Sequence, residues 1–174
     1  MRRLIIATCA LLVSNVPSVG AQRLVSLGLG GGVSVPQGDL STGANTGWHA
    51  LGSIVVSTPM QPLGLRADIA YNRFAFKSGA SGYQTVGSGT LNATYRLPTP
   101  GAPVSPYLIA GLGAYRTDCS LSACNAVTHF GWNVGLGTKL YVLGFRSFLE
   151  ARYHRTKANG SVVNYFPATF GLLF

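Results

Sequence analysis

Acidic side chains that could take part in chemistry are few in this sequence, and two of them stand beside arginines. The 174 residues include four Asp and Glu against 13 Lys and Arg. Arg66 and Asp68 lie two positions apart, as do Glu150 and Arg152, so each pair shares one face of an extended strand. Each acid could pair locally or with a facing strand, because buried charges persist only when partnered. The expected inward-facing charge cluster is Arg66, Asp68, Arg96, Lys139, Glu150 and Arg152.

A short polar segment carries two cysteines and the residue types of a nucleophilic site. Cys119 and Cys124 stand in one stretch, and this spacing in an exported chain predicts a disulfide. Metal binding is disfavoured, because two sulfurs and His129 are too few ligands, and no cofactor is expected. Asp118, Ser120 or Ser122, and His129 could also act as orienter, nucleophile and base. These are ordinary loop residues that a disulfide loop alone would bring together, so no catalytic residue is assigned.

Cations near the expected strand ends suggest a lipid partner. Nucleic acid is disfavoured, since no basic run is interleaved with aromatic residues and the chain is expected to be exported. Lys and Arg at this height can reach the phosphates of lipopolysaccharide while their stems lie on apolar surface. The alternative is a scattered, solvated rim. The candidate head-group ligands are Arg73, Lys77, Arg116, Arg155 and Lys157.

Short strands must position these side chains. The chain has 23 glycines and only 10% charged residues, and no apolar run of spanning-helix length follows its N-terminal region. Only helices and closed barrels satisfy every backbone group in lipid, and glycine disfavours helices. A soluble secreted β protein is the alternative, but its exposed face would carry more charge. The predicted strands are 23–35, 48–57, 63–76, 83–97, 107–117, 129–142, 146–155 and 164–174.

Alternation within these segments predicts which face meets lipid. In the third segment, Leu65 and Ile69 share one face while Arg66 and Asp68 share the other. The fourth, sixth and seventh segments repeat this rule, apolar outside and polar or small inside, which is the pattern of a barrel in a membrane. The second and fifth are nearly apolar on both faces, so their facing is not assigned. Outward aromatic residues are expected in two belts, with Tyr71, Trp132, Tyr153 and Phe166 near the loop end and Tyr95 and Phe174 near the turn end.

The connections are also expected to alternate in length. Polar loops at 37–47, 77–82, 118–128 and 156–163 would lie at one end, outside the cell. Shorter connections at 58–62 and 143–145 would lie at the other end. The proline-rich stretch 98–106 is longer than a turn on that side needs, and its three prolines before Ser105 predict a stiff, non-strand connection.

Both ends of the chain favour export to an outer membrane. Arg2 and Arg3 precede the apolar run 4–13, and small residues end at Ala21, which predicts a cleavable signal peptide at 1–21 and a barrel domain at 22–174. The final strand ends in apolar residues at alternate positions, and it is expected to close against the first strand. Its expected assembly-signal residues are Phe170, Leu172 and Phe174.

Three stretches carry a family resemblance. Residues 106–116 (PYLIAGLGAYR), 148–154 (FLEARYH) and 166–174 (FPATFGLLF) resemble segments of small eight-stranded outer-membrane β-barrels of the OmpX/OmpA-like, opacity-type porin family. The resemblance covers essentially the whole chain and implies an all-β, antiparallel, up-and-down barrel. It further implies that the final strand is read by the barrel assembly machinery. These motifs are architectural and identify neither a ligand nor a reaction.

Three functions follow as expectations. The first is a structural or surface-interaction role for a monomeric barrel in which the charge cluster is a static filling. The second is a narrow channel or small-molecule conduit, in which exchange of ion pairs opens a path. The third is a lipid A-modifying enzyme, because His154-Arg155-Thr156 with Asn159-Gly160-Ser161 resembles the His-x-Ser and Asn segment of lipid A deacylases. Thr156 occupies the nucleophile position and the later spacing differs, so the protein is not expected to be an enzyme. The external ligand is unknown.

Overall fold

The computed structural model describes residues 24–57, 61–77, 81–120, 125–158 and 161–174. The predicted signal peptide lies outside the described residues. Within them, no helix is long and apolar enough to cross a membrane.

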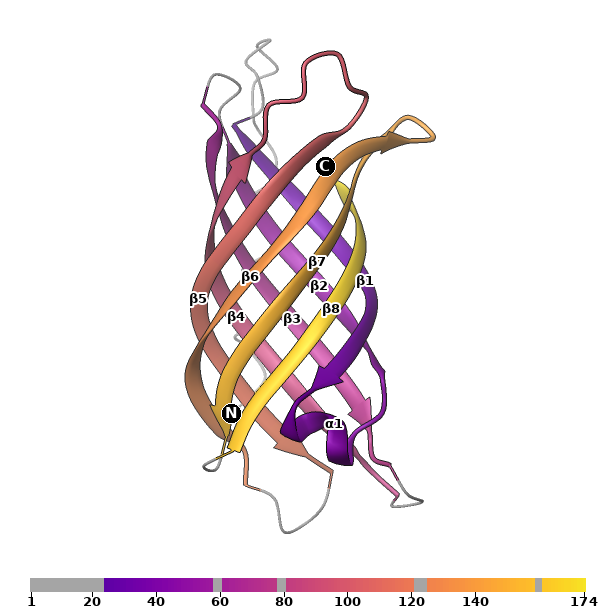
Figure 1. The fold of residues 1–174 in the computed structure, drawn as a ribbon, viewed down its shortest axis with the longest axis vertical. Helices are drawn as coiled ribbons and strands as arrows, with labels where there is room; N and C mark the ends of the chain where they lie inside the picture. The colour runs from indigo at the N-terminus through magenta and orange to yellow at the C-terminus, as the bar shows by residue number, and fades with distance from the viewer. Residues whose placement is uncertain (1–23, 58–60, 78–80, 121–124, 159–160) are drawn as a thin grey trace, which may run out of the picture.

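Eight strands wind around one axis and form a closed barrel (Figure 1). Each strand pairs antiparallel with the next, and β1 also pairs with β8 from Gly28 opposite Leu173 to Gln37 opposite Asn164. No strand edge is left unpaired, so the predicted closure of the final strand on the first is confirmed. The strands are β1 (Val25–Gln37), β2 (Gly47–Ser57), β3 (Leu63–Ala75), β4 (Tyr83–Arg96), β5 (Ser105–Cys119), β6 (Val127–Val142), β7 (Phe145–Ala158) and β8 (Ser161–Leu173).

All eight predicted strands are present, and their ends differ from the prediction by a few residues. The largest difference is at the last connection, where β7 and β8 stay paired to Ala158 opposite Ser161. The two strands therefore extend through most of the predicted loop at 156–163. The predicted connection at 98–106 is also shorter than expected, because β5 begins at Ser105. The Pro106 carbonyl in this strand accepts the Leu97 N–H at 2.9 Å.

A five-residue helix, α1 (Asp39–Gly43), interrupts the connection that was predicted as a polar loop. In Figure 1 it lies across the lower end of the barrel, away from the C-terminus at the upper end. Leu40 and Ala44 are buried, which ties this segment to the interior. We call the two ends of the barrel the α1 end and the turn end, the latter containing the connection at Leu143-Gly144.

The outer surface is apolar and the inner one largely polar at mid-height. Leu91 and Ile69 are 73% and 72% exposed, whereas their strand neighbours Asn92 and Asp68 are buried. This alternation holds in the four strands for which it was predicted. It also settles β2 and β5, where Trp48 and Leu112 point outward and His49 and Tyr107 inward.

Candidate functional site

Four of the six predicted charges form a closed ring in the middle of the lumen. Arg66 Nε lies 2.6 Å from Asp68 Oδ1, and Arg152 Nε lies 2.6 Å from Glu150 Oε1. Across the lumen, Arg66 Nη1 lies 2.9 Å from Glu150 Oε2 and Arg152 Nη1 lies 2.8 Å from Asp68 Oδ2. All four side chains are at most 4% exposed. Both arginines therefore bridge both acids, and the ring has no net charge.

Neutral neighbours complete the ring. The Tyr107 hydroxyl donates to Glu150 Oε2 at 2.7 Å, and Asn92 Nδ2 donates to Asp68 Oδ2 at 2.9 Å. The Arg66 guanidinium also lies 5.1 Å from the ring centroid of Phe148. Charge-assisted hydrogen bonds of this kind offset the desolvation of ions in a dry interior.

Glycines make room for the large partners of the ring. A Cβ on Gly137 would lie 2.5 Å from the Tyr107 hydroxyl oxygen, and one on Gly171 would overlap the ring of Phe148. The small inward positions expected from the sequence thus match large side chains on neighbouring strands.

A neutral polar layer lies next to the ring. His49 Nε2 is 2.8 Å from Thr169 Oγ1, and His49 Nδ1 is 3.2 Å from Ser34 Oγ, which donates to Asn72 Oδ1 at 2.7 Å. These side chains are all buried, and a cavity beside His49 and Arg152 has a volume of about 20 Å³, room for about one water molecule. The layer was not predicted, because the facing of the strand that carries His49 was unassigned.

The lumen at the α1 end is apolar, which differs from the expected polar interior. There Leu40 and Ala44 pack in one buried cluster with Phe74, Val86, Tyr115, Val163 and Tyr165. This inversion has a physical reason: Leu40 of α1 and the adjacent Ala44 pack against these inward side chains, which therefore meet protein rather than water.

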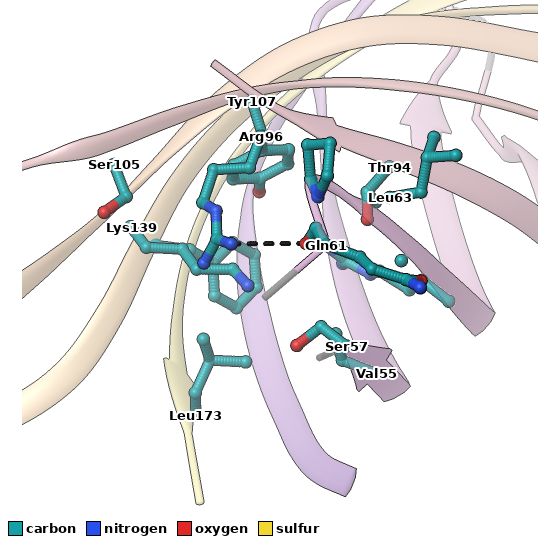
Figure 2. Close-up of a pocket in the computed structure, with 14 residues that line it drawn as sticks. Val55, Ser57, Gln61, Leu63, Thr94, Arg96, Ser105, Tyr107, Lys139 and Leu173 are labelled. Carbon is teal, nitrogen blue, oxygen red and sulfur yellow. Dashed lines mark hydrogen bonds between the residues drawn. The ribbon is translucent and has the colours of Figure 1, made fainter. Parts of the chain in front are cut away.

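The other two predicted cluster members, Arg96 and Lys139, lie at the turn end and not in the ring. Both side chains reach into a pocket there (Figure 2), where Arg96 Nη2 donates to the Gln61 carbonyl at 3.2 Å. Arg96 is exposed and Lys139 is half-buried. Sequence alternation placed both residues on the inner face but gave no information about their height along the axis.

The proposed catalytic set is not assembled among the described residues. Asp118 falls on the outward face of β5, whereas His129 pairs with inward-facing Tyr115, so the two point to opposite sides of the wall. The Asp118 carboxylate accepts the Cys119 N–H at 2.8 Å, and the Ser120 hydroxyl accepts the Tyr83 N–H at 2.9 Å. Ser122 lies outside the described residues.

The segment resembling lipid A deacylases is also structural where it is described. His154 is buried, with its Nδ1 3.0 Å from the Tyr115 hydroxyl and its ring stacked on Tyr165 at 4.8 Å. Thr156 donates to the Phe130 carbonyl at 3.3 Å, and Arg155 between them points outward.

Cys119 is disulfide-bonded. Cys124 lies outside the described residues, so their pairing remains a prediction. No cluster of three or more metal-ligating side chains occurs in the part of the chain that the structure describes.

The predicted head-group ligands all lie at the α1 end and are exposed. Arg73 stacks on Tyr83 with 3.7 Å between its guanidinium carbon and the ring centroid. Lys77 instead donates to the Ser41 carbonyl at 2.6 Å and so holds the α1 connection. We call this set the α1-end cations, namely Arg73, Lys77, Arg116, Arg155 and Lys157.

Outward aromatic residues contact each other near the same end. Trp48 lies 5.7 Å from Tyr71, and Trp132 lies 5.6 Å from Tyr153. Tyr95 and the terminal Phe174 are exposed at the turn end. A closed eight-stranded barrel with an apolar outer band between aromatic levels is the form of transmembrane barrel found in bacterial outer membranes.

Comparison with solved structures gives the same fold. Neisserial surface protein A matches at a TM-score of 0.69 and 20% identity over 86% of this chain and 95% of its own. Ail, the attachment invasion locus protein of Yersinia pestis, matches at 0.54 and 18% over 86% and 97%. The N-terminal β-barrel domain of Pseudomonas aeruginosa OprF matches at 0.51 and 18% over 86% and 96%. No protein-family profile and no curated protein sequence matches the chain. The chain is thus a small outer-membrane β-barrel by fold.

Proposed function

We propose that this barrel is a membrane-embedded scaffold whose α1-end connections form an interaction surface outside the cell. The observation that carries the proposal is the closed ion-pair ring across the lumen. Each of its acids contacts both arginines. The apolar cluster that includes Leu40 fills the lumen between the ring and the α1 end. A protein with such an interior acts through its surface. Ail, a neighbour in fold, is described as an attachment invasion locus protein, in keeping with a surface role.

The channel alternative has a direct test. A gate would require ring contacts to exchange, and breaking a buried pair costs about 3–5 kcal/mol, which makes open states rare. Purified protein in planar lipid bilayers should give no conductance above that of the bare membrane. Discrete current steps that disappear on boiling the sample would overturn the scaffold proposal in favour of a conduit.

A second candidate function is binding of lipopolysaccharide at the α1 end. It is supported by the exposed outward cations near the aromatic pairs, where Arg73 lies opposite Trp48 and Arg155 lies opposite Trp132. Among the described residues, Arg116 has no side-chain partner. Arginine recognises phosphate oxygens with a planar fork of donors, and an aromatic neighbour such as Tyr83 orients it.

Replacing the two outward arginines tests this candidate. The Arg73→Gln, Arg116→Gln double variant should retain less lipopolysaccharide through purification than the unchanged protein, and replacing all five α1-end cations should lower retention further. A matched control, Lys139→Gln with Arg146→Gln, removes two charges at the opposite end and should retain the normal amount. Equal retention by all these proteins would rule out lipopolysaccharide binding at this site.

A further inference from the structure

The turn end of the barrel contains a vestibule to which four strands contribute cations. One pocket is lined by Arg66 from β3, Arg96 from β4 and Lys139 from β6 (Figure 2). A second pocket of about 180 Å³ is lined by Lys139 and by Arg146 from β7. The two share Val55, Ser57, Ser105, Lys139 and Leu173, so they adjoin, and we call them together the turn-end vestibule.

No acidic side chain pairs with Lys139 or Arg146 among the described residues. The sequence has four acids, of which Asp68 and Glu150 are held in the ring. Asp39 lies in α1, and Asp118 lies near the α1 end of β5. Phe174 lies at the turn end, where its backbone pairs with Leu27, with Leu27 N 3.1 Å from Phe174 O.

Several cationic side chains in the vestibule have N–H groups without a hydrogen-bond acceptor in the part of the chain that the structure describes. The Lys139 ammonium has no hydrogen-bond or ion-pair partner among the described residues, and it lies 6.0 Å from the ring centroid of Tyr107. Arg66 is 4% exposed, lines the first pocket, and has a buried Nη2 without a hydrogen-bond partner. Arg146 uses one Nη2 contact, to Ser26 Oγ at 2.8 Å. A buried donor left without an acceptor destabilises the fold, so an anionic acceptor here would stabilise the barrel.

Like charges gathered in one concavity repel each other, and a bound anion reduces that repulsion. The hydroxyls of Ser57 and Ser105 line the same space and add neutral donors. A tetrahedral dianion with several acceptor oxygens suits donors that converge from different strands, and the wider pocket is several times the roughly 30 Å³ that a water molecule occupies in the liquid. We propose that the turn-end vestibule binds a phosphate group, from either a soluble phosphomonoester or a phospholipid head group. This proposal does not depend on the interaction surface proposed at the α1 end.

Calorimetric titration tests the proposal. Full-length protein folded in non-ionic detergent is titrated with glycerol 3-phosphate at low ionic strength. Saturable binding at one site is expected, and Lys139→Gln with Arg146→Gln should weaken it at least tenfold. The matched control, Lys139→Arg with Arg146→Lys, keeps both cations in the vestibule and should weaken binding far less. Unboiled gel migration verifies that each variant is folded.

A second experiment distinguishes a soluble phosphomonoester from a phospholipid head group as the ligand. The protein is placed in phosphatidylcholine nanodiscs with or without phosphatidic acid, and the glycerol 3-phosphate titration is repeated. Competition by phosphatidic acid identifies a lipid head group as ligand, and unaffected binding identifies a soluble phosphomonoester. Absence of saturable binding in detergent and nanodiscs, or equal weakening in both double variants, would overturn the proposal.

Discussion

Glu150 shows how one residue secures the interior of this barrel. Its two oxygens accept from Arg66, Arg152 and the Tyr107 hydroxyl, so the carboxylate has partners on three other side chains. The negative charge is tolerated because the ring around it is neutral as a whole. Losing that charge would leave two buried guanidinium groups with one acid between them.

The Glu150→Gln variant should therefore be destabilised by about 3–5 kcal/mol, the usual cost of breaking a buried ion pair. Urea unfolding of vesicle-embedded protein, followed by unboiled gel migration, measures this change. The control is Asp39→Asn, which neutralises an exposed acid and should alter stability by no more than ~0.5 kcal/mol. Equal unfolding midpoints for the two variants would contradict a stabilising role for the ring.

At the scale of elements, the tight β6–β7 connection stores backbone strain. Val142 pairs with Phe145, which leaves Leu143 and Gly144 as the turn, with φ of 49° and 82°. Positive φ at both central residues is the type I′ arrangement that suits hairpins, and it favours Asn-Gly. Leu143 is a branched residue in a left-handed conformation, which costs roughly 1–2 kcal/mol.

Leu143→Asn should stabilise the barrel by about 0.5–1 kcal/mol, since asparagine tolerates this backbone conformation. The same urea assay measures the gain. Leu143→Ala is the control, because it removes the exposed side chain without relieving the backbone. An equal gain from alanine would attribute the effect to the lost apolar side chain and contradict the strain argument.

At the same scale, strand alternation explains most of what was predicted. Period two in four segments correctly assigned Leu65 and Ile69 outward and Arg66 and Asp68 inward. It could not assign β2 or β5, whose two faces are both apolar in places, and so His49 and Tyr107 were missed. The outward aromatic Trp48 followed by His49 was an available signal for β2.

For the whole molecule, the apolar outer band decides where the barrel resides. Leu91 lies at the middle of that band, paired with Ala67 and Leu112, and it is 73% exposed. Leu63 pairs with Tyr95, at the aromatic level of the turn end. The free-energy cost of placing a cation on the lipid-facing surface depends on its depth in the bilayer.

Leu91→Arg should destabilise the membrane-embedded barrel by about 2–4 kcal/mol, whereas Leu63→Arg should cost about 0–1 kcal/mol because the guanidinium can reach the interface. Urea titration in lipid vesicles compares the two. A similar cost at both positions would argue against the inferred position of the bilayer.

The sequence by itself determined the eight strands, the facing of four of them and the closure of the barrel. Those features depend on local alternation and on the need to satisfy every backbone group in lipid. It also placed Asp68 beside Arg66 and Glu150 beside Arg152, because residues two apart share a face.

Only the tertiary structure decided how those charges are shared. Strand register set Arg66 and Arg152 at the height of the opposite acid, and separated Arg96 and Lys139 from the ring toward the turn end. Register along a barrel axis depends on every pairing around the wall, so no single segment encodes it. The apolar cluster under α1 likewise arises from contacts among distant strands, since Leu40 and Tyr165 meet only when the barrel closes.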